Sequence, residues 1–170
     1  MSNSSDSSLG CLGIATDRTD TESLHDEGLE VATQDGRAVY AKAAAATPAG
    51  SLVRVAPSSA TATVSAVAAL VSTGTINTGG ILAVSNVSVA VSSFGWFYTE
   101  SRNPGAGLEL RVATGCQPNV PLFTTGTGGV VDDATVSGGN LLGIKVLESA
   151  ASASTVPAIF HDIVPFAQIS

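Results

Sequence analysis

The sequence predicts an all-β fold, a compact β-sandwich or β-barrel of short strands with a flexible N-terminal arm. The 170 residues include 18 Gly and 7 Pro, which form turns and end strands at short intervals. Roughly eight to ten short apolar or alternating segments recur about every 8 to 12 residues, as in sandwiches and barrels. Charged residues make up 12% of the chain, against about 25% in an ordinary soluble domain. Small uncharged residues must therefore cover much of the surface.

The N-terminal segment differs in composition from the rest of the chain. It is rich in Ser, Thr, Asp and Glu, and the first thirty residues hold half of the 14 carboxylates. Such a segment cannot bury enough apolar area to offset the entropy lost on ordering. We therefore expect an acidic, flexible arm over residues 1–28, or one that orders only against a partner, and a β-rich domain over residues 29–170.

The domain begins with a predicted hairpin in EVATQDGRAVYAKA, residues 30–43. Short strands around Val31 and Tyr40 flank the dipeptide Asp35-Gly36, which supplies the positive backbone dihedrals of a tight turn. A Pro-Ala-Gly turn at residues 48–50 then leads into a strand over residues 52–55.

The next region, from Arg54 to Glu100, has no charged residue between its ends. Residues 61–72, TATVSAVAALVS, fit a strand and equally a short helix. Residues 87–92, VSVAVS, place valines on one face and small residues on the other. This period of two indicates a half-buried strand.

The aromatic residues concentrate in one predicted strand, SSFGWFYTES, residues 92–101. Phe94, Trp96 and Tyr98 share one face of this strand, and Phe97 takes the other. Two interpretations stay open: both faces are buried within the protomer, or one face packs on another copy, since aromatic residues are enriched at interfaces. The candidate interface residues are Phe94, Trp96, Phe97, Tyr98, Phe123, Phe160 and Phe166.

Further short strands are predicted towards the C-terminus. They lie in LELRVAT (108–114), VPLFTTGT (120–127), GGVVDDA (128–134), NLLGIKVLES (140–149) and VPAIFHDIVPF (156–166).

Residue patterns typical of catalysis or metal binding are weak. The glycine-rich TGTGG at residues 125–129 lacks the lysine and the following helix of a phosphate loop, so it indicates a turn. Asp132 and Asp133 point to opposite faces of a strand, which favours a solvated turn and leaves a weak calcium site as an alternative. His161-Asp162 has no nucleophile elbow and no ligand at metal spacing, which favours a structural or interfacial histidine. We expect no cofactor, no metal and no enzymatic activity.

Charge and cysteine content restrict the partners and the compartment. The formal net charge of -7 disfavours nucleic acid, whose phosphates need Lys and Arg. Cys11 and Cys116 show neither disulfide nor zinc spacing, which fits a reducing compartment. No apolar run reaches the roughly 18 residues of a membrane span, and the N-terminus lacks a signal-peptide pattern. We expect no membrane partner.

Four motifs resemble the capsid decoration, or cement, proteins of tailed bacteriophages. They are Gly95-Trp96-Phe97, then LFTTGT at residues 122–127 with VVDD at 130–133, and later Gly143-Ile144 before a closing TVPAIFHDIVPF. Upstream, residues 31–55 resemble the opening hairpin and following strand of that family. The resemblance covers about residues 29–166 and departs at the arm, which is longer and more acidic than the family pattern.

This resemblance implies a structural virion protein. Its protomers would form a homotrimer on the outer capsid surface, bind neighbouring major capsid protein subunits and cement them against internal pressure, after synthesis in the host cytoplasm. The acidic arm would lie along basic patches of the shell. The alternative is a phage fibre or a receptor- or carbohydrate-binding module, which exposed aromatic residues would favour and a buried Trp96 would disfavour.

Overall fold

The computed structural model describes residues 15–58, 65–76, 79–101 and 108–165, and within these ranges it contains twelve strands and no helix. About half of the described residues lie in strands, so the predicted all-β fold is confirmed. The strands are β1 (Thr19–Asp20), β2 (Glu30–Ala32), β3 (Gly36–Ala43), β4 (Leu52–Ser58), β5 (Ser65–Leu70), β6 (Ile81–Ser85), β7 (Phe94–Ser101), β8 (Glu109–Val112), β9 (Leu122–Thr124), β10 (Val131–Asp132), β11 (Asn140–Val146) and β12 (Ser154–Pro165).

Five strands form a closed barrel. Pairing runs from β3 to β5, β4, β6 and β7, and β7 pairs back to β3 along its whole length. All of these pairs are antiparallel except β3 with β5, which is parallel. Closure leaves no free sheet edge over the paired lengths of these strands.

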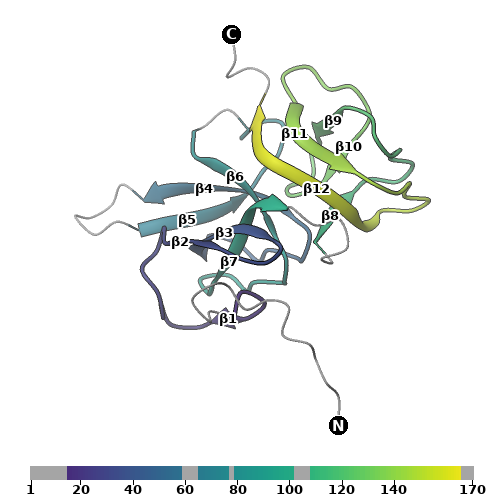
Figure 1. The fold of residues 1–170 in the computed structure, drawn as a ribbon. Coiled ribbons are helices and arrows are strands. Elements are labelled where there is room, and N and C mark those ends of the chain that lie inside the picture. The colour runs from purple at the N-terminus through teal and green to yellow at the C-terminus, as the bar shows by residue number, and fades with distance from the viewer. Residues whose placement is uncertain (1–14, 59–64, 77–78, 102–107, 166–170) are drawn as a thin grey trace.

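The C-terminal strands form a second circuit beside the barrel (Figure 1). Here β8, β12, β11, β9 and β10 pair in turn, and a single parallel bridge between Val131 and Val112 completes the circuit. The long strand β12 connects the two parts, because Phe160 and His161 pair with Ser101 and Glu100 at the end of β7.

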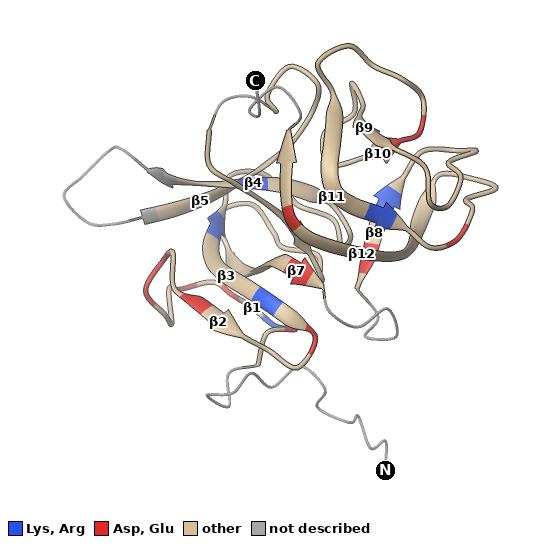
Figure 2. Cartoon of the chain, turned by 45° about the horizontal axis from the view of Figure 1, so that its top comes forward, with Lys and Arg blue, Asp and Glu red and all other residues tan. Residues whose placement is uncertain are grey.

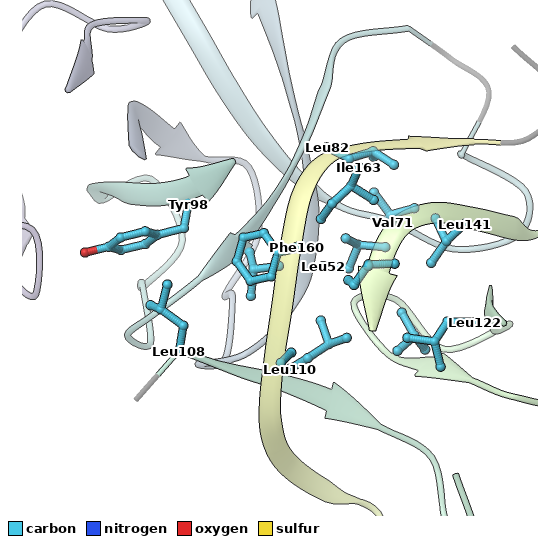
Figure 3. Packing of buried hydrophobic residues seen from close by; sticks show 14 of the residues in the cluster. Leu52, Val71, Leu82, Tyr98, Leu108, Leu110, Leu122, Leu141, Phe160 and Ile163 are labelled. Atoms are coloured by element: carbon cyan, nitrogen blue, oxygen red, sulfur yellow. The ribbon is translucent and has the colours of Figure 1, made fainter. Parts of the chain in front are cut away.

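Both faces of the aromatic strand β7 are buried within the protomer. Trp96 and Tyr98 belong to the larger core cluster, while Phe97 belongs to a second cluster on the other face. Figure 3 shows part of the larger cluster, with Phe160 of β12 between Tyr98 and Leu52 in this view. Of the two interpretations left open for this strand, burial within one chain is the one that the structure supports.

The first hairpin forms as predicted, but its turn is built differently. Antiparallel β2 and β3 pair Val31 with Ala38, and the hydroxyl of Thr33 accepts hydrogen bonds from the backbone N–H groups of Asp35 and Gly36. Asp35 does not have a positive φ. Glycine is needed at position 36 because a Cβ there would collide with the carbonyl oxygen of Glu100.

Two other sequence predictions are settled in the uncharged region. The ambiguous segment 61–72 contains strand β5, which pairs with β4 in antiparallel fashion along its whole length. The strand predicted over residues 87–92 is wrong, because the strand lies upstream, in β6. Hydrogen bonds tie Ser85 to the turn at residues 48–51 and end β6 there. Val89 then makes only an isolated bridge to Thr47, and Val91 is 57% exposed.

Residues 15–28, assigned to the arm, lie against β3 and β7. Thr19 and Asp20 pair with the start of β7, and the hydroxyl of Thr16 lies 2.7 Å from that of Tyr98. The hydroxyl of Tyr40 donates to the Asp20 carboxylate at 3.2 Å, and the same carboxylate accepts from Arg18. Acidic residues surround β1 and β2 in Figure 2. Residues 1–14 lie outside the described residues, and the division at residue 28 stays a prediction.

Asp35 gives a pH-dependent prediction. Its side chain is buried in the β2–β3 turn, and this burial raises the pKa of the carboxyl above its usual value of 3.8. Above that pH the unfolded chain releases the proton more readily than the folded chain, so ionisation favours unfolding. Asp35→Asn should therefore raise the urea midpoint at pH 7, and the gain should vanish as the pH falls below 3.8. Asp26→Asn, at an exposed position, is the matched control. Equal midpoints for wild type and Asp35→Asn at pH 7 would contradict the prediction.

Candidate functional site

A cavity with a volume of about 550 Å³ lies beside β11 and β12. We call it the β11–β12 cleft. The loop before β9 forms one wall and the paired strands β11 and β12 form the other. Apolar side chains dominate its lining, namely Val120, Leu141, Leu142, Ile144, Ile159 and Phe160. A cavity of this size and lining suits an apolar side chain or a short peptide segment.

A bulge in the β11–β12 ladder shapes this cleft. Leu142 pairs with Val164 and Ile144 pairs with Phe160, so one residue of β11 lies opposite three residues of β12. Gly143 has a φ of 76°, and Asp162 on the other strand has a φ of 44°, a left-handed conformation that non-glycine residues rarely adopt. Bulges bend a strand and redirect its side chains. The bulge thereby turns His161 towards solvent.

One edge of β11 is unpaired inside the cleft. Among the described residues, β9 pairs with β11 only at Asn140 and Leu141, and Pro121, directly before β9, has no N–H with which to continue the ladder. Beyond that point Asn119 donates its N–H to the carbonyl of Val146 at 3.1 Å. Alternate residues of a strand direct their backbone groups to the same side. Ile144 therefore presents its N–H and C=O to the cleft.

Charged groups stand at the rim of the cleft. His161 is 68% exposed, and its Nε2 lies 3.5 Å from Oε1 of the buried Glu100 while its Nδ1 lies 3.1 Å from Oδ2 of Asp162. Lys145 is exposed and lines the cleft. The hydroxyl of Ser101 donates to the carbonyl of Ala158 at 3.4 Å. These groups can bind charge, and they do not align a nucleophile with a base.

The aromatic residues predicted as interface candidates lie mostly in the protomer interior. Phe94, Trp96, Phe97, Tyr98 and Phe160 are buried, because β3 and β12 cover them within one chain. Phe123 is half-buried on β9, and Phe166 lies outside the described residues. The surface available to a partner therefore comes from other side chains, notably those around the cleft. Sequence reasoning missed Leu142, Ile144 and Ile159, although all three alternate within predicted strands.

A second cluster joins Cys116 with Asp132 and Asp133. Their potential ligand atoms lie within 4.8 Å of one another, and the Asp133 carboxylate accepts the backbone N–H of Gln117 at 3.1 Å. Burial first, and then the two carboxylates, raise the pKa of the Cys116 thiol to about 11. Metal binding requires the thiolate, so the residues present fit a metal poorly at neutral pH. The calcium alternative at these aspartates stays a prediction.

The Cys116 thiol should react slowly in the folded protein. At pH 8 a pKa of about 11 leaves roughly 100-fold less thiolate than the ordinary thiol pKa near 9 would. In a Cys11→Ser variant, iodoacetamide should therefore alkylate Cys116 at least about 100-fold more slowly in buffer than in denaturing urea. Mass spectrometry of timed samples measures both rates. Similar rates in the two solutions would show that the thiol is accessible and ionised.

No protein-family model matches the sequence, and no curated protein shows significant similarity to it. Among the described residues no helix is long and apolar enough to cross a membrane.

Proposed function

We propose that this chain is a structural protein of the virion, which binds the outside of a phage head as a homotrimer and cements neighbouring major capsid subunits. The observation that carries the proposal is the construction of the cleft. Ile144 and Phe160, from two segments of the resemblance to decoration proteins, pair with each other, and these segments form one wall of the cleft. The sequence resemblance thus coincides with an apolar recess of the molecule.

The body of the protein suits a structural role. A closed barrel joined to a second circuit of strands has few free edges, so it can transmit load without pairing indiscriminately. The net charge of -7 suits a partner surface with an excess of Lys and Arg. Attachment to the outer shell, and the absence of enzymatic activity, stay predictions.

The alternative function is a phage fibre or a carbohydrate-binding module. Such a module needs exposed rings on which sugars stack. Trp96 is 1% exposed and Tyr40 and Tyr98 are equally covered, which speaks against this alternative. A platform built from Phe123 alone would be small, since its side chain is half-buried.

The first test of the proposal is attachment to capsids. Purified chain is mixed with undecorated heads of the phage that encodes it, and the heads are then sedimented. We expect saturable binding in multiples of three copies and a higher melting temperature of the heads, because a ligand that binds the assembled state stabilises it. If the chain did not sediment with the heads at either low or physiological salt, the proposal would be contradicted. A glycan-binding screen of the same preparation addresses the alternative.

A further inference from the structure

A buried polar atom belongs to the lining of the β11–β12 cleft. Asn140, at the start of β11, lines the cleft, and its side-chain Oδ1 is buried and has no hydrogen-bond partner among the described residues. Leaving a buried acceptor without a partner costs free energy, and native proteins nearly always supply one. Asn140 therefore offers an acceptor to a molecule that brings an N–H or O–H group into the cleft.

The unpaired edge of β11 limits the shape of such a molecule. The N–H and C=O of Ile144 face the cleft where β9 leaves this edge unpaired. Leu141 pairs with Leu122 at one end of the edge. At the other end Asn119 donates its N–H to the carbonyl of Val146. A strand running along β11 would have to displace one of these ends, whereas a compact molecule would not. The cavity volume of about 550 Å³ lies within the usual range of small-molecule sites.

The apolar surface and the charges of the cleft favour a neutral molecule. Leu142 and Ile159 line the cleft and are half-buried, so an apolar ligand would remove more of their surface from water. Lys145 brings a positive charge, but the carboxylates of Glu100 and Asp162 lie on either side of the imidazole at the rim. An anion would meet these carboxylates as well as the ammonium group, and like charges placed together are unfavourable.

We propose that the β11–β12 cleft binds a small, neutral and mainly apolar molecule that donates a hydrogen bond to Oδ1 of Asn140. The apolar part of this molecule covers Leu142 and Ile159, and the backbone N–H of Ile144 is available to an acceptor on the same molecule. The ligand site goes beyond the proposed attachment to a capsid and does not depend on it, because all of its groups come from one chain.

Two isomeric probes test the hydrogen bond. 3-Methylindole and 1-methylindole have the same composition and the same apolar rings, but only 3-methylindole has an N–H donor. Each is titrated into the full-length chain, and the backbone amide signals are followed by NMR. We expect 3-methylindole to bind at least about fivefold more tightly, with the largest shifts at residues 142–145 and none at Val91, which lies outside the cleft lining. Equal affinities, or shifts that do not saturate, overturn the inference.

Substitution of Asn140 assigns the preference to one side chain. Leucine has nearly the shape of asparagine and lacks its polar atoms, so Asn140→Leu should bind the two isomers about equally. Asn140→Ala repeats the test in case Asn140→Leu misfolds, as judged by circular dichroism. Asn86→Leu, outside the cleft lining, is the matched control and should keep the preference of the wild type. A preference for 3-methylindole that persists in either folded Asn140 variant contradicts the assignment.

Two further probes test the charge and the kind of molecule that binds. Indole-3-acetate adds a carboxylate to the same rings, and N-acetyltryptophanamide carries them on a peptide backbone. Both should bind more weakly than 3-methylindole, because the rim carboxylates repel an anion and the closed edge of β11 leaves little room for a backbone. Tighter binding of indole-3-acetate that is lost in Lys145→Ala would assign the cleft to anions. Tighter binding of N-acetyltryptophanamide would assign it to a protein segment, and either result overturns the inference.

These outcomes are separable from failure of the proposed function, because the probes are titrated into the free chain without heads. A chain that binds 3-methylindole but does not sediment with heads keeps the ligand site and loses the capsid role. A chain that sediments with heads and binds neither isomer keeps the capsid role and loses the ligand site.

Discussion

Trp96→Ala should lower the free energy of unfolding by about 3 to 5 kcal/mol, the usual cost of truncating a large buried aromatic residue. The indole is 1% exposed, and its ring centroid lies 5.0 Å from that of Tyr40 and 5.4 Å from that of His25. Alanine would leave a cavity where β3, β7 and the segment after β1 meet. Urea titration followed by circular dichroism measures the change.

Two further substitutions make this prediction specific. The indole Nε1 is buried and has no hydrogen-bond partner among the described residues, so Trp96→Phe loses volume without breaking a hydrogen bond and should cost clearly less than Trp96→Ala. Val91→Ala, at an exposed position, should change stability by less than about 0.5 kcal/mol. If Trp96→Ala cost less than about 1 kcal/mol, the ring would have to lie on an exposed face.

Gly143→Ala should be the most damaging of the glycine substitutions around the cleft. Gly143 has a φ of 76°, and a Cβ at this position would collide with the carbonyl oxygen of His161 across the bulge. The left-handed backbone alone costs an alanine about 1 to 2 kcal/mol, and the collision adds about 1 to 3 kcal/mol because backbone atoms must move. Unfolding in urea should show the sum.

Gly115→Ala is the matched control for this prediction. Gly115 has a similar φ of 89°, but a Cβ there would meet no atom within 4 Å, so only the backbone cost of about 1 to 2 kcal/mol applies. Equal losses for the two substitutions would show that the β12 backbone yields to the added methyl group.

The acidic segment shows how a composition argument can miss specific contacts. Its polar residues predict a flexible arm, because little apolar area is available for burial. In the structure Asp20 and Thr16 instead direct polar groups to the hydroxyls of Tyr40 and Tyr98. Hydrogen bonds to buried groups can hold a polar segment against a core, and neither partner can be identified from the sequence spacing.

The class of fold and most of the strands follow from the sequence alone, because a period of two and frequent Gly and Pro are local properties of the chain. The aromatic strand β7 and the closing strand β12 follow from the residues that they contain. The strand predicted over residues 87–92 was wrong, and the segment 61–72 was ambiguous between a strand and a short helix. Alternation of small residues does not show whether a neighbouring strand is present to pair with them.

Which faces are buried, and where the recess lies, depends on how distant strands pack against one another. Long-range pairing brings β3 and β12 against β7 and thereby moves five of the seven candidate aromatic residues into the interior. The cleft depends on a bulge opposite Gly143 and on the ladder that stops at Pro121, which lie 22 residues apart in the sequence. Burial and register are properties of contacts between distant segments, and a one-dimensional pattern contains no information on which segments meet.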